Sequence, residues 1–185
     1  GRLRIGFLCA KWHDERDGDV LARVVHHADR NRVALYGYGS HGVDHPGNRR
    51  LRGGFDVWHD VSEFDEASLA SVIAGDGIDV LVDLSGYAAP YQLLAMARRP
   101  APRQVAWLGS PATTGLAQID ALLGDRVSDP EGTERLYTER LVRLPFGIHG
   151  YSFPAPRWGA SEAGRGITFA ADVTLGQLHP DALAA

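Results

Sequence analysis

The chain has 185 residues, of which 44% are hydrophobic and 23% are charged, and its formal net charge is -4. This composition is that of a globular domain with one sizeable core, and the mildly acidic balance argues against a nucleic-acid partner. The single cysteine, Cys9, cannot form an internal disulfide, and no apolar stretch approaches the ~20 residues of a membrane-spanning helix, so we expect a cytoplasmic protein without a membrane partner.

Short apolar runs alternate with segments of helical spacing from residue 3 to about residue 144. The runs have the length and apolarity of strands in a parallel sheet, and the expected strands are 3–9, 32–38, 56–61, 78–84, 104–108, 119–123 and 140–144. Helices are expected from Asp17 or Asp19 to about residue 28, over 65–75, and over 90–99. This alternation predicts βαβ units and hence an α/β fold with a Rossmann-like doubly wound parallel sheet.

The composition of the chain changes near residue 146. Residues 147–166 are rich in glycine, proline, serine and aromatic side chains, which is typical of a linker or an ordered wrap. Residues 167–185 open with a short strand-like run. We therefore expect a Rossmann-like lobe over 1–146, a linker over 147–166, and over 167–185 the truncated start of a second lobe or a tail.

The loop from Gly109 to Gly115 is the most informative of those that follow the expected strands. Ligands of open parallel sheets collect at the carboxyl ends of the strands. In this loop glycine permits close backbone approach, Pro111 fixes the turn, and the hydroxyls of Thr113 and Thr114 are available to a polar ligand. A plain turn between two strands explains the same composition equally well.

Several motifs between Gly77 and Pro145 resemble the amino-terminal catalytic lobe of the O-linked N-acetylglucosamine transferase family. They read GIDVLVDLSGY, ARRPAPRQVAWLGSPATTG, IDALLGDRVSDP and LYTERLVRLP in one register. The opening LRIGFLC is similar to the first strand of that lobe, and GITF near the end is similar to the first strand of the second lobe. The resemblance implies two Rossmann-like lobes that face each other across a cleft, the glycosyltransferase-B arrangement.

The resemblance also implies an inverting, metal-independent transfer of N-acetylglucosamine from UDP-N-acetylglucosamine to Ser or Thr hydroxyls of a protein, without a cofactor. The expected partners are the nucleotide-sugar donor, a protein or peptide acceptor, and a C-terminal lobe, missing here, that supplies most contacts to UDP. We expect the chain alone to be inactive and able to self-associate through the surface where that lobe docks. The positions matched to the loops beside sugar and acceptor are Tyr87, Leu108, Gly109, Pro111, Thr113 and Thr114.

Family members carry a histidine in the loop after the first strand, where Glu15 stands in this sequence and His13 lies two residues away. Sugar transfer requires a proton to leave the acceptor hydroxyl, and a base with a pKa near neutrality accelerates this step by about 10²- to 10⁴-fold. His13 is therefore the candidate base, and Glu15 replaces it if burial raises the pKa of its carboxyl. A solvated loop is the alternative for both. Bacterial relatives also often have His in place of Tyr87 and Tyr in place of Ser110.

Other signals in the sequence fit structural roles better. Gly37, Gly39 and Gly42 spell G-x-G-x-x-G, but they follow the second expected strand and no helix opens after them, so we expect no dinucleotide site there. The neighbours His26 and His27 point in different directions on a helix, and His41 and His45 in a loop have no third ligand at a recognisable spacing, so we expect no metal site.

Two classes of function stay open at this point. The chain is either half of an active glycosyltransferase or a noncatalytic, degenerate glycosyltransferase-like binding or scaffold domain, which the changes at Glu15, Tyr87 and Ser110 favour. A Rossmann-like domain for another nucleotide is a third, weaker reading. The first reading requires the segment that starts at Trp107 to enter an open crevice at the carboxyl edge of the sheet.

Overall fold

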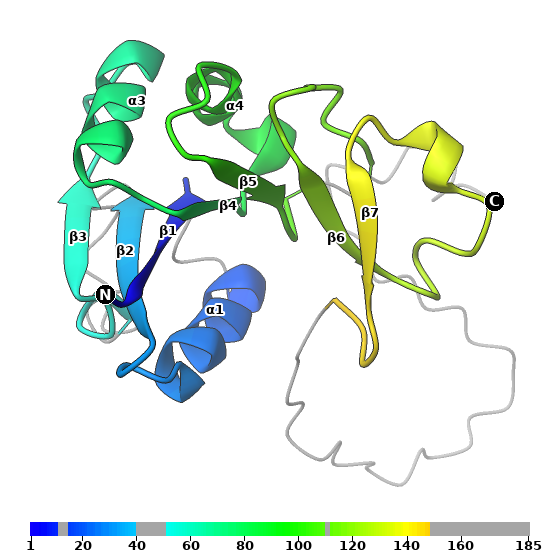
Figure 1. Ribbon diagram of the computed structural model, residues 1–185, viewed down its shortest axis with the longest axis horizontal. Helices are drawn as coiled ribbons and strands as arrows, with labels where there is room; N and C mark the ends of the chain where they lie inside the picture. Colours follow the sequence, from blue (N-terminus) through cyan, green and yellow to red (C-terminus); the bar gives the residue numbers. More distant parts are fainter. Residues whose placement is uncertain (11–14, 40–50, 110–111, 149–185) are drawn as a thin grey trace, which may run out of the picture. The chain divides into compact units, whose positions relative to one another are not determined.

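A sheet of parallel strands forms the centre of the fold, as the alternation of strand and helix predicted (Figure 1). The computed structural model describes residues 1–10, 15–39, 51–109 and 112–148, and all of them belong to one compact unit. Within them the strand order is β3-β2-β1-β4-β5-β6-β7, and every neighbouring pair is parallel. The strands are β1 (Leu3–Cys9), β2 (Val33–Gly39), β3 (Val57–Asp60), β4 (Val80–Asp83), β5 (Arg103–Ala106), β6 (Ala121–Asp125) and β7 (Arg140–Leu144).

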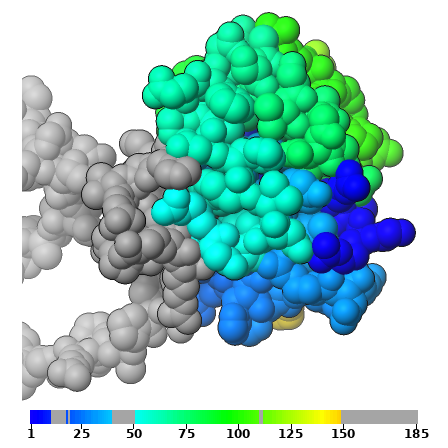
Figure 2. All heavy atoms as spheres, turned by 90° about the vertical axis from the view of Figure 1, so that its left-hand side faces the viewer, coloured from blue at the N-terminus to red at the C-terminus, as the bar shows by residue number. Residues whose placement is uncertain are grey.

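Helices cover both faces of the sheet, which makes it doubly wound. Helix α1 (Glu15–His27) lies on one face, and α3 (Glu66–Gly75) and α4 (Pro90–Ala97) lie on the other (Figure 1). Two short 3₁₀ turns, η1 (Gly86–Ala88) and η2 (Glu134–Leu136), belong to the loops. Figure 2 shows the molecule from its β3 edge. The segment that begins at residue 51, drawn in cyan, forms the middle of this surface, and the N-terminal elements, drawn in blue, lie below it.

Each face of the sheet has its own hydrophobic core. On the α3 and α4 face, Leu69, Ile73 and Met96 pack without exposure against the sheet, and on the α1 face Leu21 and Val25 pack against another group of strand residues. The sheet therefore has two buried faces, which explains why its strands are continuous apolar runs rather than alternating ones.

Local chemistry sets the helix boundaries. The Asp65 side chain accepts the backbone N–H of Ser68 at 2.8 Å and so caps the start of α3. Pro90 is the first residue of α4, where its missing N–H costs nothing. The predicted helix over 90–99 ends two residues early, because Arg99 takes a positive φ of 53°.

A few expectations about the elements were wrong in detail. Val24, expected on the buried face of its helix, is 38% exposed. The predicted strand over 78–84 is shorter in the structure, where β4 covers Val80–Asp83, although the N–H groups of Asp79 and Leu84 still donate to carbonyl oxygens of β1. The expected linker over 147–166 and the segment 167–185 lie outside the described residues, apart from residues 147 and 148.

The two described glycines of the G-x-G-x-x-G signal belong to the sheet and not to a nucleotide-binding loop. Gly37 and Gly39 lie within β2, and the Trp58 ring covers Gly37 so closely that a Cβ there would lie 2.7 Å from the ring atom Cζ3. Gly42 lies outside the described residues. In the described part of the chain, no helix has both the length and the apolarity to cross a membrane.

Candidate functional site

The order of the strands singles out the carboxyl ends of β1 and β4. Chain connections run outward in opposite directions from these two central strands, so β1 and β4 flank the switch point of the sheet. Ligands of open α/β sheets bind outside the carboxyl ends of the strands at such a point. The residues that leave β1, β4 and β5 therefore define the candidate site.

A buried carboxylate shapes the turn after β4. Asp83 is 1% exposed, and its two oxygens accept the backbone N–H groups of Ser85 at 3.0 Å and Gly86 at 2.9 Å. Burial raises the pKa of Asp83 to about 6, and the two N–H groups counteract that rise. The Ser85 hydroxyl oxygen accepts the N–H of Ala10, 2.8 Å away, so this turn is bonded to the exit of β1.

The chain leaves β5 through a strained turn at the same edge. Leu108 has a φ of 65°, and the N–H of Gly109 donates to the carbonyl of Trp107 at 2.8 Å, which makes a γ-turn of the rare positive-φ kind. Such backbone conformations cost on the order of 1–3 kcal/mol for a residue other than glycine and cluster at functional sites. The described start of the segment thus lies at the carboxyl edge of the sheet, where the sequence predicted it.

Gly109 packs directly on the turn after β4. A Cβ at this position would lie 2.7 Å from the backbone nitrogen of Ser85, and closer still to the Ser85 carbonyl carbon and the Gly86 nitrogen. Only glycine permits this approach of two backbones. The loops after β1, β4 and β5 therefore form one connected structure.

Tyr87 connects that structure to the two threonines. The Tyr87 hydroxyl donates to the carbonyl oxygens of Thr114 at 2.7 Å and Thr113 at 3.2 Å, while 57% of the residue stays exposed. The expectation that both threonine hydroxyls are available to a ligand is wrong. Both donate to the carboxylate of Glu139, with 2.7 Å between Thr113 Oγ1 and Glu139 Oε2.

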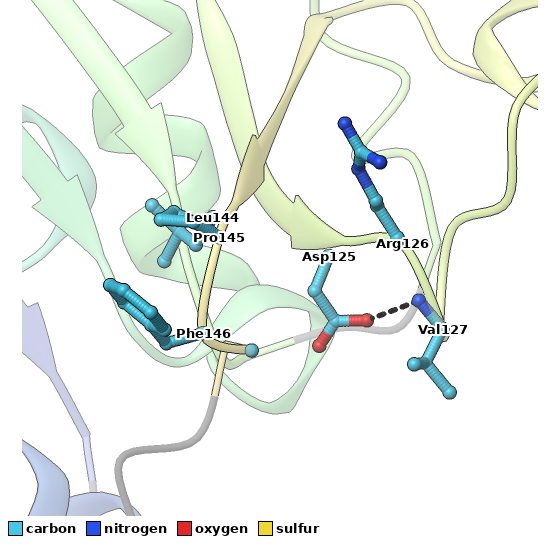
Figure 3. Close-up of a pocket in the computed structure, with 7 residues that line it drawn as sticks. Asp125, Arg126, Val127, Leu144, Pro145 and Phe146 are labelled. Atoms are coloured by element: carbon cyan, nitrogen blue, oxygen red, sulfur yellow. Dashed lines mark hydrogen bonds between the residues drawn. The ribbon is translucent and has the colours of Figure 1, made fainter.

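A shallow cavity of about 390 Å³ continues this edge of the sheet at the ends of β6 and β7. Asp125, Arg126 and Val127 form one side, and Leu144, Pro145 and Phe146 the other (Figure 3). The backbone N–H groups of Ser128 and Ile148 lower the pKa of Asp125 and occupy its oxygens together with the Val127 N–H. The cavity is thus lined mainly by apolar side chains and by a carboxylate that already has its partners.

The structure brings most of the predicted site residues together. Tyr87, Leu108, Gly109, Thr113 and Thr114 belong to one network of neighbouring loops. Glu15 is the first residue of α1, at the end of the loop that follows β1. His13, Ser110 and Pro111 lie outside the described residues.

Two residues of this network were not expected from the sequence. Asp83 and Glu139 are both buried, at 1% and 4% exposure. Asp83 accepts two backbone N–H groups of the turn after β4, and Glu139 accepts one backbone N–H and two hydroxyls of the threonine loop. Asp83 lies within the motif GIDVLVDLSGY and Glu139 within LYTERLVRLP, but nothing in either motif marks the carboxylate as buried or as a partner of the site loops. No group of three potential metal ligands exists within residues 1–10, 15–39, 51–109 and 112–148.

Comparisons with known proteins point to one family. Residues 1–151 match the family described as glycosyl transferase family 41. The chain is 45% identical over 103 residues to a probable UDP-N-acetylglucosamine–peptide N-acetylglucosaminyltransferase, SPINDLY, of Oryza sativa subsp. japonica, a match that covers 56% of this chain and 11% of that protein. It is 31% identical over 146 residues to the UDP-N-acetylglucosamine–peptide N-acetylglucosaminyltransferase of Caenorhabditis elegans, a match that covers 78% of this chain and 13% of that protein.

A solved structure has the same fold. An O-GlcNAc transferase mutant of Thermobaculum terrenum superimposes with a TM-score of 0.78 at 40% sequence identity, over 83% of this chain and 30% of that one. The chain therefore spans about a tenth of the length of the curated relatives and under a third of the solved one.

Proposed function

Because this chain belongs to glycosyl transferase family 41, we propose that it forms the first lobe of an inverting glycosyltransferase that moves N-acetylglucosamine from UDP-N-acetylglucosamine to Ser or Thr hydroxyls of proteins. The names of the relatives support the donor and the acceptor class. A second lobe that holds most of the UDP is part of the proposal, and residues 1–146 are the first lobe in it. This chain alone is then unable to catalyse turnover.

One observation carries the proposal: a strained γ-turn at Leu108 lies against the turn after β4, at the switch point of a parallel sheet. This is the place where such sheets bind ligands. We assign Leu108, Gly109 and Pro111 to the wall beside sugar and acceptor, and Tyr87 to the same wall because its ring stays exposed there. Thr113 and Thr114 shape the loop, since their hydroxyls already donate to Glu139.

The acceptor hydroxyl must lose a proton when its oxygen attacks the anomeric carbon and UDP departs. In the proposed mechanism His13 accepts that proton, and Glu15 is the alternative base. Both belong to the connection between Ala10, which is bonded to the turn after β4, and the start of α1. A base on the loop after β1 is thus attached to the same edge of the sheet as Leu108 and Gly109.

The proposed reaction needs neither a metal ion nor a cofactor, because the departing UDP is bound by groups of the second lobe. We place the protein in the cytoplasm, with a protein or peptide acceptor as its partner, and assign it no partner among nucleic acids or membranes. The isolated chain self-associates in this proposal, and the exposure of Val127 at 89% and Phe146 at 96% supports that part.

The test is transfer by the full-length protein. Radiolabelled UDP-N-acetylglucosamine and a Ser/Thr-rich peptide are supplied, and labelled peptide is the expected product. His13→Ala should reduce transfer by about 10²-fold or more if the histidine is the base, and Glu15→Gln should then have the smaller effect. A full-length protein that neither binds UDP nor consumes the donor would support the noncatalytic, degenerate domain instead.

A further inference from the structure

We propose that Glu139 is a positioning residue for the transfer reaction, because it fixes the loop of Thr113 and Thr114 and, through that loop, the Tyr87 side of the crevice. The inference rests on the proposed function. Glu139 lies next to the start of β7, and the residues it binds lie 25 and 26 positions away in the sequence.

Both oxygens of the Glu139 carboxylate accept hydrogen bonds from the loop. Oε2 accepts the Thr113 hydroxyl at 2.7 Å, and Oε1 accepts the Thr114 N–H at 2.8 Å together with the Thr114 hydroxyl. Glu139 is 4% exposed and Thr114 is 5% exposed. Burying a carboxylate costs free energy unless hydrogen bonds replace its water, and here three donors from one loop do so.

The Thr113 hydroxyl makes every hydrogen bond of which it is capable. It accepts the N–H of Gly115 at 3.1 Å and the N–H of Thr138 at 3.1 Å while its proton goes to Glu139. A hydroxyl has one proton and two lone pairs, so all three are engaged. The loop is therefore held in one conformation by groups that come from the segment before β7.

This conformation is passed on to the crevice by Tyr87. Its hydroxyl donates to the carbonyl oxygens of Thr113 and Thr114, so the position of the tyrosine depends on the loop that Glu139 holds. Tyr87 directly follows Gly86, on which Gly109 packs. Glu139 itself does not reach that contact, and it acts on the crevice only through the loop.

A role in positioning predicts an effect on the rate of transfer and not on the capture of UDP. A displacement of about 1 Å in a reacting geometry can cost on the order of 10²-fold in rate. A substitution at Glu139 should therefore lower kcat for peptide glycosylation, while the affinity for UDP, which the second lobe provides in the proposed function, stays the same.

The decisive variant is Glu139→Gln in the full-length protein. The amide keeps the shape of the side chain but turns one acceptor into a donor, which faces a threonine hydroxyl that already has its donors. The matched control is Glu131→Gln, the same chemical change at an exposed position in the preceding loop. Measurements are kcat and KM for donor and peptide, UDP affinity by calorimetry, and the melting temperature.

We expect kcat to fall about 10- to 100-fold in Glu139→Gln with UDP affinity within twofold of the wild type, and the control to match the wild type. An active, folded Glu139→Gln variant with unchanged kcat overturns the inference, and so does a loss of kcat with an equal loss of UDP affinity. If the variant does not fold, Thr113→Val removes one of the three donors at a half-buried position and should lower kcat several-fold. Unchanged kcat in Thr113→Val then overturns the inference. A wild-type protein without any transfer activity refutes the proposed function itself, a result that the variants cannot produce.

Discussion

Replacing Gly109 with alanine tests whether the loops after β4 and β5 are packed as one structure. The added Cβ would lie 2.7 Å from the Ser85 nitrogen and closer to two neighbouring backbone atoms, whereas real Cβ contacts almost never fall below 3.0 Å. These atoms are backbone, so no side-chain rotation can relieve the overlap. The turn after β4, or the γ-turn at Leu108, must move.

Overpacking of this kind costs about 1–3 kcal/mol. Alanine also restricts the unfolded chain, which stabilises a protein by about 0.4–1 kcal/mol where the backbone conformation tolerates it. The net loss of unfolding free energy for Gly109→Ala should therefore be about 1–2 kcal/mol. Gly75→Ala is the control, since a Cβ there has no heavy atom within 4 Å and Gly75 is the last residue of α3.

Urea unfolding measures both variants, with tryptophan fluorescence as the signal because Trp107 lies two residues from the substitution. Gly75→Ala should be neutral or slightly more stable than the wild type. In the full-length protein, Gly109→Ala should also lower the rate of the proposed transfer by about 10- to 100-fold, since the turn that must move borders the proposed site for sugar and acceptor. Equal stability of the two variants would show that the loops after β4 and β5 do not meet as described.

Further predictions concern the buried carboxyl, the core and the division of labour between lobes. Burial raises the pKa of Asp83 to about 6 from an ordinary value of 3.8, so the folded state binds the extra proton and stability falls as pH rises from about 4 to about 6. This contribution to the unfolding free energy is on the order of 3 kcal/mol. Measured by urea unfolding across that pH range, the unfolding free energy of Asp83→Asn should fall less with rising pH than that of the wild type. The same pH dependence in both proteins would contradict the assignment. Ile73→Ala, at a position without exposure between α3 and the sheet, should lower the unfolding free energy by about 2–5 kcal/mol in the same assay at pH 7. Calorimetry should detect no UDP binding to the 185-residue chain alone, and tight binding would refute the assignment of the UDP contacts to a second lobe.

Local patterns in the sequence were sufficient to predict the architecture. The apolar run Leu3–Cys9 became β1, which lies between β2 and β4 in the sheet, and Pro90 opened its helix where proline is tolerated. The loop at Leu108 and Gly109 was also predicted at the correct edge of the sheet, because the ends of parallel strands all point the same way.

The predicted chemistry of that loop was less accurate. Thr113 and Thr114 were expected to offer free hydroxyls, but Glu139 takes both. The sequence contains no sign of this contact, since Glu139 and the exposed Glu131 are acidic residues of the same surface-like stretch. Which of them is buried depends on where the segment before β7 meets the loop of Thr113 and Thr114.

The sequence by itself therefore determined the strands and the helices, because burial leaves apolar runs in the strands and helical spacing in the helices. It also determined the edge of the sheet where a ligand should bind, because parallel strands end at the same edge. Only the tertiary structure decided which loop residues hydrogen-bond to or pack against one another. Contacts such as Gly109 on Ser85 or Thr114 on Glu139 join segments more than twenty residues apart, and their geometry follows from strand order and loop conformation, for which no local pattern exists.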